Sequence, residues 1–125
     1  MLYSQEVQPA PDYKDGDIVV IQYSANWCGP CRILSNLIKN DAELQGLIKT
    51  DTKGYFFIDI ENPKTQAEQD WLNRAIITSL PTVVKYVYKN GTWVKQAQFK
   101  GYRDKQFLLK WLSTPKIQRV NRVWT

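Results

Sequence analysis

The segment Trp27-Cys28-Gly29-Pro30-Cys31 decides how this chain is interpreted, because it holds the only two cysteines among 125 residues. The preceding residues 18–23, Ile-Val-Val-Ile-Gln-Tyr, form an apolar run with the length of a strand. In the segment that follows, the apolar residues recur with helical spacing at Ile33, Leu34, Leu37 and Ile38. The two cysteines are therefore predicted to lie where a strand leads into a helix.

This placement predicts a specific chemistry for the two sulfurs. A partly exposed thiol at the start of a helix has its thiolate favoured by the helix dipole and by backbone N–H groups that lack partners. The thiolate is the attacking species in thiol–disulfide exchange, and Cys31 follows Cys28 by one helical turn, close enough to form a disulfide. The pattern indicates a reversible dithiol–disulfide centre.

Two other uses of a Cys-x-x-Cys pair fit the sequence less well. A structural zinc site normally takes four ligands, usually Cys or His, and this chain has two cysteines and no histidine. Covalent haem attachment requires a histidine directly after the second cysteine, where Arg32 stands. We therefore expect no metal and no cofactor other than the redox-active disulfide between Cys28 and Cys31.

Three segments together resemble the thioredoxin family. The first is the Trp-Cys-Gly-Pro-Cys segment after an apolar strand, and the second is residues 79–84, Ser-Leu-Pro-Thr-Val-Val, which resemble the cis-proline segment of that family. The third is residues 99–102, Phe-Lys-Gly-Tyr, which resemble the glycine loop before its last helix. The resemblance covers about residues 17–112. It implies the thioredoxin fold, an α/β fold with a mixed sheet of four to five strands and helices on both faces, and the reduction of protein disulfides.

The resemblance also implies different roles for the two cysteines of the motif. Cys28 is expected to attack the substrate disulfide, and Cys31 is expected to resolve the resulting mixed disulfide. Gly29 and Pro30 between the cysteines resemble the reducing members of the family, and Pro30 restrains the start of the helix. Trp27 is either a core aromatic residue or, as the family match implies, a residue that shields the disulfide and contacts substrate.

The other two segments supply the expected substrate-binding residues. Pro81 is either an ordinary proline at a strand start or, as the resemblance implies, a cis-proline against the sulfurs that leaves the Leu80 backbone free to pair with an extended substrate. Gly101 is expected to let the backbone approach the same groove, although a plain turn explains it equally well. Lys100 and Tyr102 flank this glycine, and Lys100 puts a positive charge where the family usually has an apolar residue.

Two positions depart from the family pattern. Gln22 stands six residues before Cys28, where the family usually buries an aspartate, and Ser24 stands where it has a second tryptophan. A carboxylate can accept a proton from a thiol, whereas an amide only donates and accepts hydrogen bonds. We therefore expect Gln22 to support the active site from behind the dithiol, with water or a neighbouring carboxylate as the base.

The remaining elements are predicted from local signals. Asn40 and Glu43 have capping-box spacing, which opens a second helical stretch after the first helix ends near Lys39. Asn90-Gly91 indicates a hairpin, in whose second strand Trp93, Ala97 and Phe99 are expected on one face. Further helices are expected from Asn62-Pro63 to about Asn73 and after a cap at Asp104. Strands are expected at residues 18–23, 55–60, 82–88 and 93–100.

The whole chain, residues 1–125, is expected to form one thioredoxin-like domain with an extended arm at 1–17 and a basic tail at 113–125. The arm is expected to include a short strand near residues 2–7. It shows no signal-peptide pattern, and the longest aliphatic run, residues 18–21, is far too short to span a bilayer. We expect a cytoplasmic monomer that does not associate with membranes.

Charge is distributed unevenly along the chain. Residues 1–84 carry a net charge of −4 and residues 85–125 a net charge of +9. This asymmetry is either a solvated surface or a patch that attracts acidic partners or phosphate backbones. The expected partners are disulfide-containing proteins, a thioredoxin reductase or other thiol donor, and acidic proteins. The alternative function is a docking subunit of a larger enzyme, such as one acting on nucleic acid.

Overall fold

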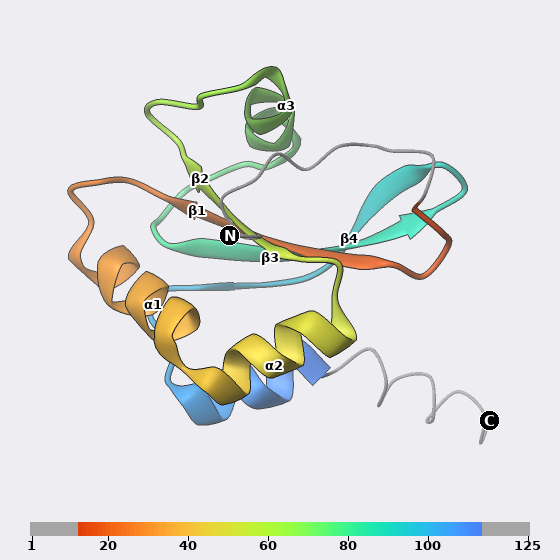
Figure 1. Cartoon of the computed structure of the whole chain (residues 1–125). Helices are drawn as coiled ribbons and strands as arrows, with labels where there is room; N and C mark the ends of the chain where they lie inside the picture. Colours follow the sequence, from red (N-terminus) through yellow and green to blue (C-terminus); the bar gives the residue numbers. More distant parts are fainter. Residues whose placement is uncertain (1–12, 114–125) are drawn as a thin grey trace.

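Four strands form one mixed sheet in the order β2-β1-β3-β4, and a computed structural model describes residues 13–113 of the chain (Figure 1). Their bounds are β1 (Ile18–Ser24), β2 (Tyr55–Asp59), β3 (Thr82–Lys89) and β4 (Thr92–Lys100). β1 pairs parallel with β2 and antiparallel with β3, which pairs antiparallel with β4. The predicted mixed sheet is confirmed with four strands. The expected strand near residues 2–7 and the tail beyond residue 113 lie outside the described residues.

The helices cover both faces of this sheet, as Figure 1 shows. α1 (Gly29–Asn40), α2 (Ala42–Asp51) and a further helix at residues 105–113 lie on one face, and α3 (Gln66–Arg74) lies on the other. The Asp104 carboxylate caps the helix at 105–113 by accepting from the Phe107 backbone N–H at 3.0 Å, as predicted. No helix among residues 13–113 has the length and apolar character needed to cross a membrane.

β1 lies at the centre of the sheet and contributes to both hydrophobic layers. Ile18 and Val20 pack with α1, α2 and the helix at 105–113, while Val19, Ile21 and Tyr23 pack on the α3 face. Because both faces of β1 are covered, its sequence is a continuous apolar run and does not alternate between apolar and polar residues. This central strand delivers the chain directly to the two cysteines.

The layer on the α3 side is rich in aromatic residues. Trp71, Tyr86 and Trp93 stack there at ring-centroid distances of 4.8 and 5.8 Å. The hydroxyl of Tyr23 donates to the carbonyl oxygen of Trp71 at 2.7 Å and lies 3.0 Å from the hydroxyl of Tyr86. Burial raises the pKa of Tyr23 and Tyr86, so both hydroxyls stay neutral in this layer.

The second helical stretch begins one residue later than predicted. Asp41, rather than Asn40, is the N-cap of α2, because its carboxylate accepts from the Leu44 backbone N–H at 3.0 Å. Asn40 is instead the last residue of α1. The break between the two helices is therefore confirmed, and the capping residue was assigned wrongly.

The helix expected from Asn62-Pro63 also begins later than predicted. Thr65 is the N-cap of α3, since its hydroxyl accepts from the Glu68 backbone N–H at 3.1 Å. The Glu68 carboxylate in turn accepts from the Lys64 backbone N–H at 2.7 Å. Thr65 and Glu68 have capping-box spacing, and their side chains accept from the backbone N–H groups of Glu68 and Lys64, which fixes the start of α3 beyond the proline.

The β3–β4 hairpin contains a bulge that the sequence did not reveal. The register shifts between Lys85, which pairs with Ala97, and Tyr86, which pairs with Lys95, so Gln96 is an extra residue. Trp93 consequently packs on the α3 face, whereas Phe99 packs on the opposite face. The prediction that these two aromatic residues share a face was wrong, because one extra residue inverts the alternation.

β3 also buries a lysine in the layer between the sheet and the helix at 105–113. Lys85 is 1% exposed, its ammonium group donates to the carbonyl oxygen of Trp111, and it lies 4.3 Å from the centroid of that ring. Burial lowers the pKa of Lys85 to about 8. The last turn of the helix, whose carbonyl end favours a cation, therefore holds this charge inside the protein.

Candidate active site

The two cysteines lie at the junction between β1 and α1. Cys28 is the N-cap of α1, and its sulfur accepts from the Cys31 backbone N–H at 3.2 Å. Pro30 occupies the first turn, where its missing N–H costs no helical hydrogen bond. The predicted position of the motif, at a strand end and a helix start, is confirmed.

Cys28 and Cys31 are joined by a disulfide, with their Cα atoms 5.2 Å apart. Cys28 is 5% exposed and Cys31 is 1% exposed. The expectation of a partly exposed first thiol was therefore wrong for this disulfide state, in which Cys28 is buried. Of the two sulfur-bearing residues, Cys28 is still the one closer to solvent.

A groove of about 450 Å³ opens beside Cys28, and its walls are mostly apolar. Trp27 forms one wall and is 65% exposed, which excludes its interpretation as a core aromatic residue. The indole N–H of Trp27 donates to the Glu61 carboxylate at 3.0 Å, and this bond orients the ring at the groove. The full lining is Trp27, Cys28, Gly29, Pro30, Ile60, Ile77, Thr78, Ser79 and Leu80.

The opposite wall of this groove is the segment that leads to Pro81. The Leu80–Pro81 peptide bond is cis, as the family resemblance implied. The carbonyl oxygen of Pro81 accepts from the Gly101 backbone N–H at 2.8 Å, and Gly101 has a φ of 82°, a conformation that favours glycine. Leu80 lines the groove together with Cys28.

The predicted substrate-binding residues divide into two groups. Trp27, with Gly29 and Pro30 of the motif, lines the groove, as does Leu80. The groove lining does not include the other four predicted residues, which are Pro81, Lys100, Gly101 and Tyr102. The Lys100 ammonium group nevertheless donates to the Thr78 hydroxyl, on the groove wall, at 2.8 Å.

Four lining residues were missed by the sequence reasoning. Three of them immediately precede Leu80-Pro81, and this position next to a predicted site residue could have identified them from the sequence. The fourth follows the last residue of β2. They are Ile77, Thr78, Ser79 and Ile60.

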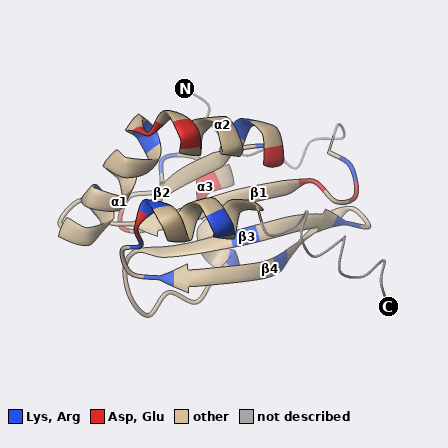
Figure 2. Cartoon of the chain, turned by 90° about the horizontal axis from the view of Figure 1, so that it is seen from below, with Lys and Arg blue, Asp and Glu red and all other residues tan. Residues whose placement is uncertain are grey.

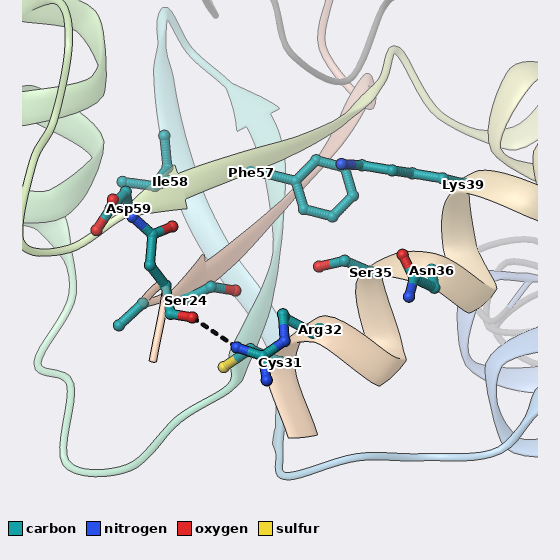
Figure 3. A pocket seen from close by; sticks show the side chains of 11 residues that line it. Ser24, Cys31, Arg32, Ser35, Asn36, Lys39, Phe57, Ile58 and Asp59 are labelled. Atoms are coloured by element: carbon teal, nitrogen blue, oxygen red, sulfur yellow. Dashed lines mark hydrogen bonds between the residues drawn. The ribbon is translucent and has the colours of Figure 1, made fainter. Parts of the chain in front are cut away.

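A second pocket, of about 320 Å³, lies beside Cys31, and most of the residues that line it have polar side chains (Figure 3). Arg32 lies next to Cys31 at its edge, and the guanidinium of Arg32 donates to the carbonyl oxygen of Asn26 at 2.8 Å. The polar side chains in the lining are those of Ser24, Asn26, Arg32, Ser35, Asn36, Lys39 and Asp59. The two cysteines of one disulfide therefore border two different surfaces.

Gln22 is completely buried behind this pocket, and its amide group is fully hydrogen-bonded. Its nitrogen donates to the hydroxyls of Ser24 and Ser35, both at 2.9 Å, and its oxygen accepts from the Tyr55 hydroxyl at 2.6 Å. Burial raises the pKa of Tyr55, so this cluster of four side chains is neutral. Both serines line the pocket beside Cys31, so their hydroxyl groups lie between Gln22 and that pocket.

Within residues 13–113, no group of three or more His, Cys, Asp or Glu residues is placed to hold a metal ion. The redox-active element that these residues contain is the disulfide between Cys28 and Cys31.

Comparisons with known proteins agree with this geometry. A family model described as Thioredoxin matches residues 3–114. The chain is 36% identical over 97 residues to the thioredoxin of Rickettsia conorii, covering 76% of this chain and 78% of that protein. It is 35% identical over 92 residues to the thioredoxin of Chlamydia pneumoniae, covering 73% and 76% respectively. The fold resembles the solution structure of a thioredoxin from Thermus thermophilus, with a TM-score of 0.64, 20% sequence identity and coverage of 78% and 72%.

Proposed function

This chain belongs to the thioredoxin family and is a thiol–disulfide oxidoreductase, and on this premise we propose that it reduces protein disulfides with Cys28 as the attacking sulfur and Cys31 as the resolving sulfur. The observation that carries the proposal is the asymmetry of the two sulfurs. Cys28 caps α1 and borders the groove at Trp27, whereas Cys31 lies one turn deeper. A thiolate at a helix N-terminus is stabilised, so Cys28 is the better nucleophile near neutral pH.

The reaction proceeds in two exchanges of sulfur–sulfur bonds. In the reduced protein, the Cys28 thiolate attacks one sulfur of the substrate disulfide, forming a mixed disulfide and releasing one substrate thiol after protonation. Cys31 then loses its proton and attacks the sulfur of Cys28. This step releases the second substrate thiol and leaves the Cys28–Cys31 disulfide. Two electrons have passed to the substrate, and a thiol donor must restore the dithiol.

The groove beside Cys28 is suited to hold an extended segment of the substrate. Its apolar walls, Trp27 on one side and the segment ending at Leu80 on the other, offer contact area without a deep cavity. Backbone pairing with Leu80 would fix the direction of the substrate chain and leave its sequence free to vary. This mode of binding supports action on many different protein disulfides.

The proton of Cys31 leaves by a route that does not involve Gln22. The amide of Gln22 does not titrate, and its hydrogen bonds are already occupied by Ser24, Ser35 and Tyr55. Cys31 and Asp59 both line the pocket beside Cys31. We assign the role of proton acceptor to solvent in this pocket, with the Asp59 carboxylate as its nearest anionic partner in the lining.

The setting of this activity is also a proposal. Residues 1–125 form a single catalytic domain that works as a monomer in the cytoplasm, where glutathione and related donors keep thiols reduced. Disulfide-containing proteins are the substrates, and a thioredoxin reductase or another thiol donor restores the dithiol. The family and the disulfide support the general chemistry, and the need for a donor follows from the two electrons that each substrate disulfide consumes.

The test is catalytic reduction of a model protein disulfide with dithiothreitol as the electron donor. The protein should accelerate the reaction well above the rate with dithiothreitol alone, and the variant carrying both Cys28→Ser and Cys31→Ser should not. An intact fold by circular dichroism without any turnover would contradict the proposal and favour the alternative of a docking subunit.

A further inference from the structure

A third groove, of about 360 Å³, lies between the end of α3 and the edge strand β4. Three of its lining side chains are cationic, namely Arg74, Lys95 and Lys100, and its lining contains no carboxylate. The remaining lining residues are Ala75, Ile76, Thr78, Val84, Tyr86 and Gln98. The groove therefore combines three positive charges with a partly apolar wall.

The bulge in the β3–β4 hairpin explains why the cations of β4 gather here. Lys95 pairs with Tyr86 and Gln98 pairs with Val84, so both point to the α3 face. In a regular strand, Lys95 and Gln98 would point to opposite faces, because they are three residues apart. The extra residue Gln96 places both side chains on the same face of the sheet.

Arg74 approaches the groove from the other side. It lies in the last turn of α3, with its guanidinium 4.8 Å from the centroid of the Trp71 ring. This stacking on a buried aromatic residue restricts the long side chain to one region. Less conformational freedom is then lost when the guanidinium binds a ligand.

The three cations lack anionic partners in the described part of the chain. The ion pairs between residues 13 and 113 both involve Lys105, which belongs to a different surface. The ammonium of Lys95 donates to the Gln98 side chain at 3.1 Å, and that of Lys100 donates to the Thr78 hydroxyl at 2.8 Å. In Figure 2 the ribbon of β4 carries blue segments and no red ones. Mutual repulsion in this groove favours the binding of an anion.

The groove adjoins the one beside Cys28, since Thr78 lines both. At a rise of about 3.3 Å per residue, the extended distance from Leu80 to Thr78 is roughly 7 Å. An extended substrate that pairs with the backbone at Leu80 therefore reaches the cationic groove within a few residues of its reactive cysteine.

We propose that the groove formed by Arg74, Lys95 and Lys100 binds an acidic side chain of the protein substrate, about two to four residues from the cysteine that Cys28 attacks. The inference rests on the proposed function and gives it a sequence preference. The apolar wall at Ala75 and Ile76 suits the methylene groups of a glutamate, and the cations suit its carboxylate. A nucleic-acid backbone is a poorer fit, since the cations converge on one hollow and do not follow a line of phosphates.

The test compares pairs of peptide disulfides that differ only by Glu or Gln at each position near the reactive cysteine. At one or two positions, kcat/KM for the Glu peptide should exceed that for the Gln peptide by about three- to tenfold at low salt, and the ratio should fall with added salt. Lys95→Gln should remove the preference, and Lys95→Arg should retain it. Lys89→Gln, a charge change in the same hairpin but outside the groove, should leave the preference unaltered.

A second measurement does not depend on turnover. Peptides with Ser in place of Cys should shift the amide resonances of Lys95 and Gln98 more strongly, and with a lower Kd, when they carry Glu rather than Gln. Equal Kd values and equal kcat/KM values would overturn the inference. Turnover absent for every peptide would contradict the proposed function, while the Kd ratio would still decide the inference. A different outcome would also overturn the inference: the Glu and Gln peptides bind equally, and a single-stranded oligonucleotide displaces both from the wild-type protein but not from Lys95→Gln. That result would indicate a phosphate-binding surface.

Discussion

The two sulfurs of the Cys28–Cys31 disulfide face two different environments only one helical turn apart. The groove beside Cys28 is lined mainly by apolar groups, including Trp27 and Leu80. Most of the residues that line the pocket beside Cys31 have hydroxyl, amide or charged side chains, among them Asp59. The first surface is suited to docking a protein chain, and the second is suited to transferring a proton. One turn of helix thus separates the two tasks of the reaction.

This difference shows how one short motif can accept many substrates while the protein itself provides the proton transfer. Apolar docking beside Cys28 carries little information about substrate sequence. Proton transfer beside Cys31 concerns the protein alone and does not depend on the substrate. Changes beside Cys28 should therefore alter KM, and changes beside Cys31 should alter kcat.

The largest effects are expected from the two cysteines themselves. Cys28→Ser should abolish disulfide reduction, because the attacking sulfur is lost. Cys31→Ser should still attack, and it should accumulate covalent mixed disulfides with substrates, visible by non-reducing electrophoresis and mass spectrometry. If Cys31→Ser were inert and Cys28→Ser trapped substrates, the two environments would have been assigned to the wrong steps.

The next effect in size is expected at Trp27. Trp27→Ala removes an exposed aromatic wall and its hydrogen bond to Glu61, so KM for a protein disulfide should rise by about tenfold with little change in kcat. Trp27→Phe, which keeps an aromatic ring and loses the hydrogen bond, is the matched control. Its KM should lie between that of the wild type and that of Trp27→Ala. A loss confined to kcat would show that the apolar side takes part in the chemistry.

A smaller change, a severalfold increase in turnover near pH 7, is expected for Gln22→Asp. The new carboxylate can accept the Cys31 proton through Ser24 or Ser35, which the amide cannot do. Burial should raise the pKa of this carboxylate above its unfolded value of about 3.9. The folded state then binds more protons, so the free energy of unfolding should decrease as pH rises above about 4. Stopped-flow kinetics and urea unfolding at pH 5 and pH 8 measure both effects.

Tyr55→Phe is the control for Gln22→Asp. It removes one hydrogen bond to Gln22 without adding a charge, so it should lower the free energy of unfolding by about 1 kcal/mol at every pH in this range. Unchanged rate and stability in Gln22→Asp would show that position 22 does not communicate with Cys31.

The smallest effect is expected at Asp59. If solvent in the pocket accepts the proton and Asp59 assists it, Asp59→Asn should lower kcat by about twofold and leave KM unchanged. Asp70→Asn, on the surface of α3 away from the pocket, should have no effect. A tenfold loss of kcat would indicate that Asp59 is itself the base. A change in KM would contradict the assignment of substrate docking to the groove beside Cys28 alone.

The sequence predicted the parts of the site that depend on local signals. The apolar run of β1, the Cys-x-x-Cys spacing and Pro30 together placed Cys28 at a helix start. Asn90-Gly91 predicted the hairpin, and both residues have positive φ as a two-residue turn requires. The cis bond at Pro81 was available only through the family resemblance, because local sequence alone favours trans.

What the sequence did not reveal depends on contacts between distant segments. The bulge near Lys95 has no local signature and appears only when β4 is paired with β3. The burial of Lys85 likewise needs the carbonyl oxygen of Trp111, 26 residues away, as an acceptor. The hydrogen-bond cluster of Gln22 joins β1 to α1 and β2 through Ser35 and Tyr55. Periodicity describes single elements, so it cannot show which buried polar group finds which partner.

The neutral cluster around Gln22 also has an electrochemical consequence. The sequence contains no histidine, and the side chain buried behind Cys31 is an amide, so no proton near neutrality is exchanged there when the disulfide is reduced. Below the pKa of the Cys28 thiol, two electrons are then accompanied by two protons, both on the sulfurs, and the midpoint potential should fall by about 59 mV per pH unit. The line should stay straight until the first thiol ionises. Over that range, the reducing power of the protein should therefore change linearly with pH.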